Sequence, residues 1–340
     1  GGNFWLSSGA GAVTVNVGGN LTVNGGTLDI ANGSGVGIIN VGGDVSLSSG
    51  TLTEGGSTTT SKIVFNKTGT QNYASGASIT NTVNFEVATN SSVNIGTNVI
   101  SGAGTVTVNN GGTIKVGSTS ASGALAGNVT ASGGVVLNTG STVEYNGVAA
   151  QTLAARTFHH IVISNTTGVT QSGVITVNGT LTLASTATLD AAAQVITFGA
   201  GASATINGTL KTANTNGLMG STNTTFNNTN SPTITLGATS TVEYNASTAQ
   251  AFSTSLNYNN VTISGNSTKT ISGASTISGT LTLTAGVLDA GNVLTVPSTG
   301  SIVYNGGSLI NYTLPSALNN FTPPTGTTSL SSDIALSGTL

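Results

Sequence analysis

Two adjacent histidines, His159 and His160, carry the most versatile chemistry in this sequence, because an imidazole can serve as a general base or as a metal ligand. They stand in an alternating run that predicts a β-strand, where neighbouring side chains point to opposite faces. Two imidazoles on opposite faces cannot bind one metal ion without distortion. A later repeat holds Asn259 and Asn260 at the same positions. We therefore interpret the histidine pair as structural, at a turn or at the start of a strand.

The carboxylates are candidates for glycosidase chemistry, which needs two carboxylates that face each other across the scissile bond. No two of them are close in sequence. Three aspartates each follow a leucine, and two glutamates share one Thr-Val-Glu-Tyr-Asn phrase, so they mark repeated structural slots. The carboxylates are Asp29, Asp44, Glu54, Glu86, Glu144, Asp190, Glu243, Asp289 and Asp333. The sequence therefore predicts no catalytic, cofactor-binding or metal-ligating residue, and no cofactor.

Other signals for a site are also incomplete. The Thr-x-Thr steps at Thr180 and Thr280 fit an ice-binding face locally, but they do not recur in every repeat. Tyr145, Tyr244 and Tyr304 share one repeat slot, which favours stacking in a core over an exposed sugar platform. The sequence has no cysteine, so disulfides and thiolate metal sites are excluded.

Charge is scarce along the chain. Only 4% of the 340 residues are charged, and the formal net charge is -3, whereas ordinary soluble domains carry about 25% charged residues. Nucleic-acid binding needs clustered Lys and Arg, and a membrane-spanning helix needs about 20 consecutive apolar residues. Neither is present, so the sequence predicts no nucleic-acid partner and no membrane insertion.

Short alternating runs dominate the sequence and predict half-buried β-strands bounded by Gly, Asn and Ser. Residues 18–28 return as residues 42–52, which gives a period of 24 residues. A longer unit overlays this period: residues 141–146 (STVEYN) return as 240–245, and Gln151 matches Gln250. One such coil cannot bury its own apolar face, but coils stacked about 4.8 Å apart form a continuous core.

We therefore predict an all-β fold: a parallel β-helix or β-solenoid of roughly 24-residue coils, with no significant helix. The predicted segments are N-terminal coils (1–60), three repeat units (61–140, 141–239 and 240–313), and a Pro-containing junction with the start of a further unit (314–340). The sequence opens without Met and closes on Ser337–Leu340, which repeats Ser278–Leu281. We expect the chain to be a fragment of a longer protein.

The phrases VGGNLTVNGGTLDI (residues 17–30), STVEYNG followed by QTL (141–153) and VNGTLTL followed by TLD (177–190) resemble the repeat regions of giant secreted surface proteins of Bacteroidetes, exported by the type IX secretion system. The resemblance covers nearly the whole chain. It implies an extracellular or cell-surface location and an adhesin or stalk role. Passenger domains of type V autotransporters and filamentous haemagglutinins are similar at this level and stay open as alternatives.

The predicted function is that of a non-catalytic structural or adhesive repeat segment that displays or spaces a binding surface; we predict that it is not an enzyme. The expected partners are surface glycans, other cell-surface or secretion components, and further repeats of the same chain. The alternatives are a carbohydrate-active or glycan-binding β-helix, lyase-like or lectin-like, and, less favoured, an ice-binding protein. The enzyme hypothesis requires Glu144, Asp190 or His159 to meet in a groove across adjacent coils.

Overall fold

The structure is a computed structural model that describes residues 2–57, 59–254, 256–323 and the backbone of 335–336. Over these residues the chain is all-β, with parallel strands stacked as a β-solenoid of about 15 turns and roughly 21 residues per turn. This confirms the predicted fold class. Pro324, Asp333 and residues 337–340, which belong to the predicted junction and further unit, lie outside the described residues.

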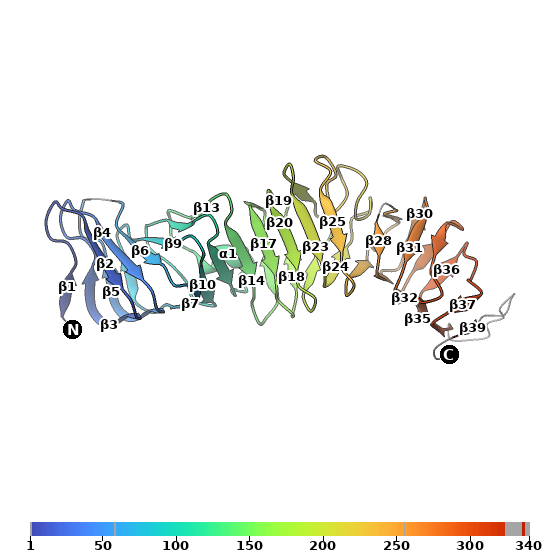
Figure 1. Cartoon of the computed structure of the whole chain (residues 1–340), viewed down its shortest axis with the longest axis horizontal. Coiled ribbons are helices and arrows are strands. Elements are labelled where there is room, and N and C mark those ends of the chain that lie inside the picture. Colours follow the sequence, from blue (N-terminus) through green and yellow to red (C-terminus); the bar gives the residue numbers. More distant parts are fainter. Residues whose placement is uncertain (1, 58, 255, 324–334, 337–340) are drawn as a thin grey trace. The chain divides into compact units, whose positions relative to one another are not determined.

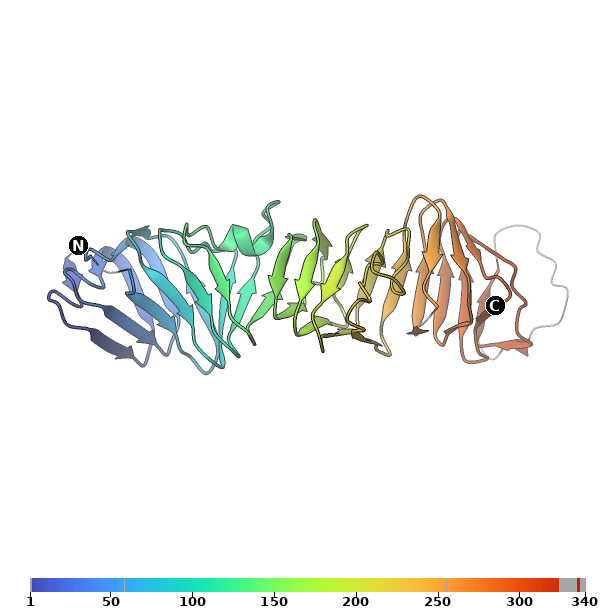
Figure 2. The same cartoon turned by 90° about the horizontal axis from the view of Figure 1, so that it is seen from above.

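The chain divides into two compact units. Figures 1 and 2 show the strands of both, coloured along the sequence. Unit 1 comprises Gly1–Leu153 and Phe158–Asn165, and unit 2 comprises Ala154–Thr157 and Thr166–Leu340. The strands β15 (Gln151–Leu153) and β16 (Arg156–Phe158) lie where the chain passes from one unit to the other.

Unit 1 contains two parallel sheets in which neighbours in space are successive coils in sequence. The first sheet has the order β1 (Asn3–Trp5), β3 (Leu21–Asp29), β5 (Val45–Thr53), β7 (Gly69–Ala74), β10 (Ser91–Gly96), β12 (Thr113–Val116), β14 (Thr142–Tyr145) and β17 (His160–Ile163), with β8 (Ser78–Thr80) also paired to β5. The second has the order β2 (Val13–Val17), β4 (Gly37–Val41), β6 (Lys62–Phe65), β9 (Asn84–Val87), β11 (Val106–Val108) and β13 (Val135–Leu137).

Unit 2 repeats this arrangement with shorter sheets around one long one. The long sheet has the order β18 (Val169–Gln171), β21 (Thr188–Asp190), β24 (Thr209–Thr212), β26 (Thr241–Tyr244), β29 (Asn260–Ile263), β32 (Thr280–Leu283), β35 (Ser301–Tyr304) and β38 (Asn320–Thr322). Two shorter groups of paired strands are β20 (Thr180–Leu183), β23 (Ser203–Ile206) and β25 (Thr233–Leu236), and β19 (Ile175–Val177) with β22 (Ile196–Phe198). Further along the chain, one group is β27 (Gln250–Phe252), β30 (Thr268–Ile271), β33 (Val287–Asp289) and β36 (Ser308–Ile310), and another is β28 (Asn257–Tyr258), β31 (Ser275–Ile277) and β34 (Leu294–Thr295). The last pair is β37 (Ala317–Leu318) with β39 (Ala335–Leu336).

The predicted alternation of side chains is what fills the core. In β4, for example, Ile39 and Val41 are buried while Asn40 between them faces outward. Asn40 Nδ2 donates to Asn16 Oδ1 at 2.8 Å, 24 residues earlier. Near the end of unit 2, hydrogen bonds between successive coils join residues that are 20 or 21 positions apart in the sequence. The 24-residue coil thus holds in the first coils of unit 1 and shortens later.

Glycine recurs where one coil passes closely over the one before it. Gly50 has a φ of +86°, and a Cβ there would lie 2.6 Å from the carbonyl oxygen of Gly26 in the preceding coil. A Cβ on Gly208 would lie 2.3 Å from the carbonyl oxygen of Ala184. Backbone approach this close tolerates no side chain, which explains the Gly-Thr-Leu step at both positions.

Buried glutamines brace the corners of the coils and explain the longer repeat. In unit 1, Gln151 Nε2 donates to the carbonyl of Val116 at 2.8 Å, and its Oε1 accepts from Gly147 N–H at 2.8 Å. In unit 2, Gln250 Nε2 donates to the carbonyls of Thr212 at 2.8 Å and Asn214 at 2.9 Å. Turning the chain exposes backbone groups that strands would have paired, and the amide supplies both a donor and acceptor for them.

Two loops interrupt the regular coils. In unit 1, the loop after β12 holds the five-residue helix α1 (Ala124–Asn128), drawn as the coiled ribbon in Figure 2. Asn128 is fully buried; its Nδ2 donates to two backbone carbonyls, while its Oδ1 accepts two backbone N–H groups. In unit 2, residues 213–232 form a long loop between β24 and β25 that buries Leu218 and Phe226.

Replacing Gln250 by methionine keeps most of the side-chain volume and removes its hydrogen bonds. Ala246 N–H, which donates to Gln250 Oε1 at 3.3 Å, then loses its buried acceptor. We expect the free energy of unfolding to fall by about 1–3 kcal/mol, measured by urea denaturation followed by circular dichroism. The control Thr205→Ala, at an exposed position, should stay within about 0.5 kcal/mol of the parent chain. Equal stability of Gln250→Met and the control would contradict the bracing role.

Candidate functional site

Each described glutamate that the sequence placed in the Thr-Val-Glu-Tyr-Asn slot lies in the same setting. Glu144 Oε2 is 3.1 Å from Lys115 Nζ, and its Oε1 accepts from Ser164 Oγ at 2.7 Å. Glu243 in unit 2 is 3.0 Å from Lys211 Nζ and accepts from Ser264 Oγ at 2.6 Å. Both oxygens of each carboxylate are engaged. The shared slot is therefore a cross-strand ion pair on the outer face of the sheet.

The aspartates that follow leucine form a second repeated slot, and it is a turn, as predicted. Asp29 Oδ1 accepts from Ala31 N–H at 3.2 Å, and Asp190 Oδ1 accepts from Ala192 N–H at 2.8 Å. Asp289 makes the same bond to an N–H two residues on. These are side-chain turns that reverse the chain at the end of a strand.

The nearest approach to a glycosidase pair in unit 2 is Asp190 with Glu243. Strand register places Asp190 beside Lys211 and Lys211 beside Glu243. The two carboxylates are thus two strands apart, about 9.6 Å at the usual strand spacing, within reach of the separation in inverting glycosidases. Lys211 occupies the strand between them and binds Glu243. The arrangement is a row of alternating charges, and it offers no gap for a sugar ring.

The histidine pair lies at a bend and at the start of a strand, as the sequence predicts, but its two side chains do not point to opposite faces. β17 begins at His160, so His159 lies outside the strand and the two side chains do not diverge. Their ring centroids are 4.3 Å apart in an edge-to-face contact. His159 Nδ1 is shielded from water and has no hydrogen-bond partner. The pKa of His160 lies below its usual range because of burial and, secondly, the neighbouring His159.

Among the described residues, the histidine pair has no third side chain with which it could hold a metal ion. Among the residues that the structure describes, no group of three or more His, Cys, Asp or Glu side chains is placed to hold a metal ion. The counterparts in unit 2, Asn259 and Asn260, donate to backbone carbonyls of the preceding coil. The slot therefore accepts either residue type as a structural element.

The tyrosine slot belongs to the core. Tyr145 and Tyr244 are at most 1% exposed, and Tyr244 stacks on Phe252 with a centroid distance of 4.6 Å. Tyr145 meets Phe158 edge to face. Both rings are therefore buried in the core, as predicted, and cannot serve as a sugar platform.

A threonine array appears where the sequence suggested only isolated steps. The strands β20, β23 and β25 lie side by side in unit 2 (Figure 1) and pair in register, so that their outward residues form two rows of three hydroxyls. The rows are Thr180, Ser203 and Thr233, and Thr182, Thr205 and Thr235. The steps do not recur in every coil, as predicted, since the β17 strand of the same sheet has His160 and Val162 at these positions, but they do align over these three strands. The loop 213–232 precedes β25 in the sequence, but β25 still pairs in register with β23.

One buried cation, the amine of Lys269, is not predictable from the sequence. Lys269 is fully buried, and its Nζ donates to the carbonyl of Ala246 at 2.7 Å and to Ser267 Oγ at 2.8 Å. Burial lowers the pKa of this amine. Two further carbonyl contacts complete its coordination, so Lys269 braces a corner much as the glutamines do.

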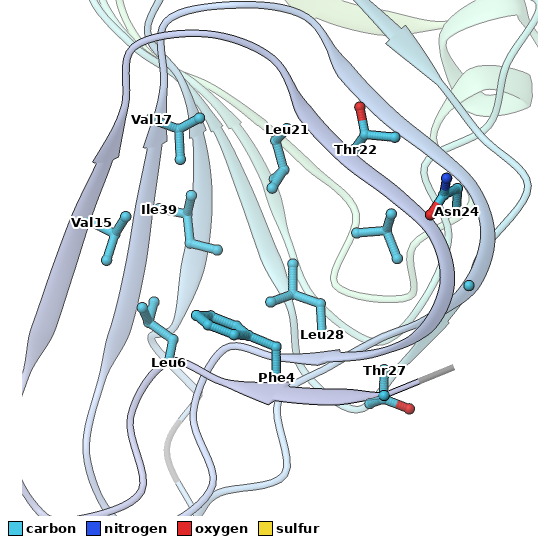
Figure 3. Close-up of a pocket in the computed structure, with 13 residues that line it drawn as sticks. Phe4, Leu6, Val15, Val17, Leu21, Thr22, Asn24, Thr27, Leu28 and Ile39 are labelled. Atoms are coloured by element: carbon cyan, nitrogen blue, oxygen red, sulfur yellow. The ribbon is translucent and has the colours of Figure 1, made fainter.

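An apolar pocket of about 350 Å³ lies at the first coil of unit 1. Figure 3 shows Phe4, Leu6 and Leu28 pointing toward Val17 and Leu21 across the space that the coil encloses. Phe4 is 61% exposed, although its equivalents in later coils are core residues. Within the described strands, β1 and β2 each pair on one side only. The pocket is thus the open end of the core.

The described residues contain no helix long and apolar enough to cross a membrane.

We expect the double variant His159→Asn/His160→Asn to fold, because the same slot holds two asparagines in unit 2. It should also lose a pH dependence. A histidine whose pKa is lower in the folded state makes the fold less stable as pH falls below about 6.5, since the unfolded chain takes up the proton first. Unfolding midpoints measured from pH 7 to pH 5 should fall more steeply for the parent chain. Parallel profiles for the two proteins would contradict this.

Comparison of the chain with protein-family models, with curated proteins and with solved structures found no match.

Proposed function

We propose that this chain is a non-catalytic structural and adhesive segment of a long extracellular or cell-surface protein, in which stacked coils display and space a binding surface. The observation that carries the proposal is the outer face of the long sheet in unit 2, where similar side chains stack in rows. One row runs through Thr188, Thr209, Thr241, Asn260 and Thr280. It lies beside the charged row of Asp190, Lys211 and Glu243. A row that repeats one neutral chemistry from coil to coil suits extended contact more than a single catalytic centre.

The ion pairs support the same function. Glu144 and Glu243 are each held between a lysine and a serine, so their charges stabilise the register of the coils. Each oxygen of these carboxylates already has a partner within the protein. The carbohydrate-active alternative would need a carboxylate pair with space between its members.

The sequence resemblance to type IX secretion substrates of Bacteroidetes leads us to propose that route of export, with type V export as the alternative. Surface glycans and other cell-surface components are the partners we propose.

Further coils of the same repeat type are the remaining proposed partner. The open pocket beside β1 and β2 continues the interface that β2 forms with β4, where Val15 pairs with Ile39. An added coil in the same register would cover the exposed Phe4 and pair the free strand edges.

Surface display predicts that an antibody raised against this chain labels intact cells of the organism that produces it. Protease added outside the cells should remove the label, while a cytoplasmic marker protein stays intact. Beads coated with the chain should bind those cells or their secreted matrix more than beads coated with a charge-matched unrelated protein. Labelling that requires permeabilised cells would exclude the proposed location.

Ice binding is a second candidate, favoured by the hydroxyl array on β20, β23 and β25. Its side chains repeat about every 4.8 Å across strands and about every 6.6 Å along them, and none is charged. If the array binds ice, the chain should inhibit ice recrystallisation, and Thr205→Lys with Thr235→Lys should abolish the inhibition. The same pair of changes at Thr270 and Thr295 is the control. Ice crystals that grow equally with and without the chain would exclude this candidate.

A further inference from the structure

The first coil of unit 1 leaves two strand edges unpaired beside an apolar pocket. Among the described strands, β1 pairs only with β3 and β2 pairs only with β4. Figure 3 shows Phe4 of β1 and Val15 of β2 in the wall of this pocket. Exposed strand edges are usually protected by charged residues or proline. Residues 1–28 contain no Asp, Glu, Lys, Arg or Pro, so this edge lacks both protections.

Residues of the first coil are exposed where their partners 24 residues later are buried. Trp5 is 56% exposed and pairs in register with Asp29, which is 5% exposed. Val15 is 36% exposed and pairs with Ile39, which is 3% exposed. The second coil is buried because it has a coil on each side. The first coil therefore has the apolar side chains of an inner coil and one uncovered face.

Five glycines of the first coil leave space for a close neighbour. Each recurs 24 residues later, and a Cβ on that later glycine would lie 3.2 Å or less from a backbone atom of its counterpart in the first coil. Among the described residues, nothing lies within 4 Å of a Cβ built on the five first-coil glycines. Close approach of another backbone is a reason for glycine, and in the first coil that backbone is missing. The pairs are Gly2 with Gly26, Gly9 with Gly33, Gly11 with Gly35, Gly18 with Gly42, and Gly19 with Gly43.

Outward asparagines indicate the polar part of a matching neighbour. Asn20 Oδ1 accepts from Asp44 N–H at 2.8 Å, and Asn16 Oδ1 accepts from Asn40 Nδ2 at 2.8 Å. The same two bonds, moved back by one coil, place an acceptor beside the N–H of Asn20 and another beside Nδ2 of Asn16. An asparagine at each of the two positions supplies these acceptors.

We propose that this end docks one further coil of the 24-residue repeat, wound parallel to β1 and β2 in the register that the second coil keeps with the first. Its apolar side chains cover Phe4 and Val15, its backbone passes over the five glycines, and its asparagines continue the outward rows. A small apolar ligand would fill the pocket but leave both strand edges unpaired. The proposal rests on the proposed role of the chain as a repeat segment and specifies the partner of its first coil.

The test places a copy of residues 25–48 directly before Gly1 of the full chain. The copy aligns with residues 1–24, so its junction with Gly1 repeats the junction between Asn24 and Gly25. Trp5 is the single tryptophan of the chain and the copy contains none, so fluorescence reports on the docking surface. We expect the emission of Trp5 to move to shorter wavelength and its quenching by acrylamide to fall at least twofold.

Two controls separate docking from simple lengthening of the chain. In the first, serine replaces the copies of Leu28, Ile39 and Leu47, which keeps the length and removes the apolar face. The second is Gly11→Ala/Gly19→Ala, at two glycines whose φ angles are not left-handed. Both added methyl groups have open space in the parent chain, so its unfolding midpoint should not change. In the extended chain they block the close approach, and the quenching of Trp5 should return to the parent value.

Equal quenching of Trp5 in the extended and parent chains would overturn the proposal. Equal protection by the serine-substituted copy, or protection that survives Gly11→Ala/Gly19→Ala, would also overturn it. Sedimentation of the parent chain tests the rival occupant: a dimer at micromolar concentration in which Trp5 is protected would mean that a second copy covers this end, against the proposal. Surface labelling of cells uses the chain without an added coil, so a failure of docking leaves the adhesive function standing, and a failure of labelling leaves the docking result in place.

Discussion

The parallel hydrogen bonding of each coil to its neighbours is the constraint on which the rest of this structure depends. It fixes the register strand by strand, and it leaves the corners as the places where backbone groups lose their partners. Side-chain amides fill that need: Gln151 and Gln250 do so in the two units, and Asn128 does so from inside α1. Because an unsatisfied buried carbonyl is costly, the corner residues recur with the long period even where the strands vary.

The same constraint accounts for the low charge of the chain. Residues in register lie about 4.8 Å apart, and like charges directly opposite each other are destabilising. A charged side chain is tolerated where its neighbour in the row has the opposite charge, as Lys115 has with Glu144 and Lys211 with Glu243. Many other outward positions hold threonine, serine or asparagine, as Thr180, Ser203 and Thr233 do. Neutrality is thus a result of stacking, and it determines which ligands the faces can meet.

Much of the fold was predictable from sequence because it depends on alternation and repetition. The alternation of apolar and polar residues predicts the strands, and the 24-residue repeat predicts the length of the first coils. The repeated positions of Asp29 and Glu144 are a turn and an ion pair in the structure. Contacts made by loops were not predictable. His159 meets His160 because the strand begins between them, which leaves His159 in the bend before it. The threonines of β25 join those of β20 and β23 across an inserted loop, so no fixed spacing reveals the array. The buried contact between the hydroxyls of Tyr244 and Tyr258 joins two strands, and nothing in the sequence predicts it.

The loop 213–232 also bears on how such a chain can diversify. It lengthens one coil while the strands on both sides keep their pairing, since β25 still pairs in register with β23. The equivalent place in unit 1 carries a short helix instead. A change of length or composition at this corner therefore leaves the scaffold intact, much as a hypervariable loop does on a conserved framework. Duplication of coils followed by divergence of their corners would let one gene accumulate many different recognition surfaces without redesigning its core.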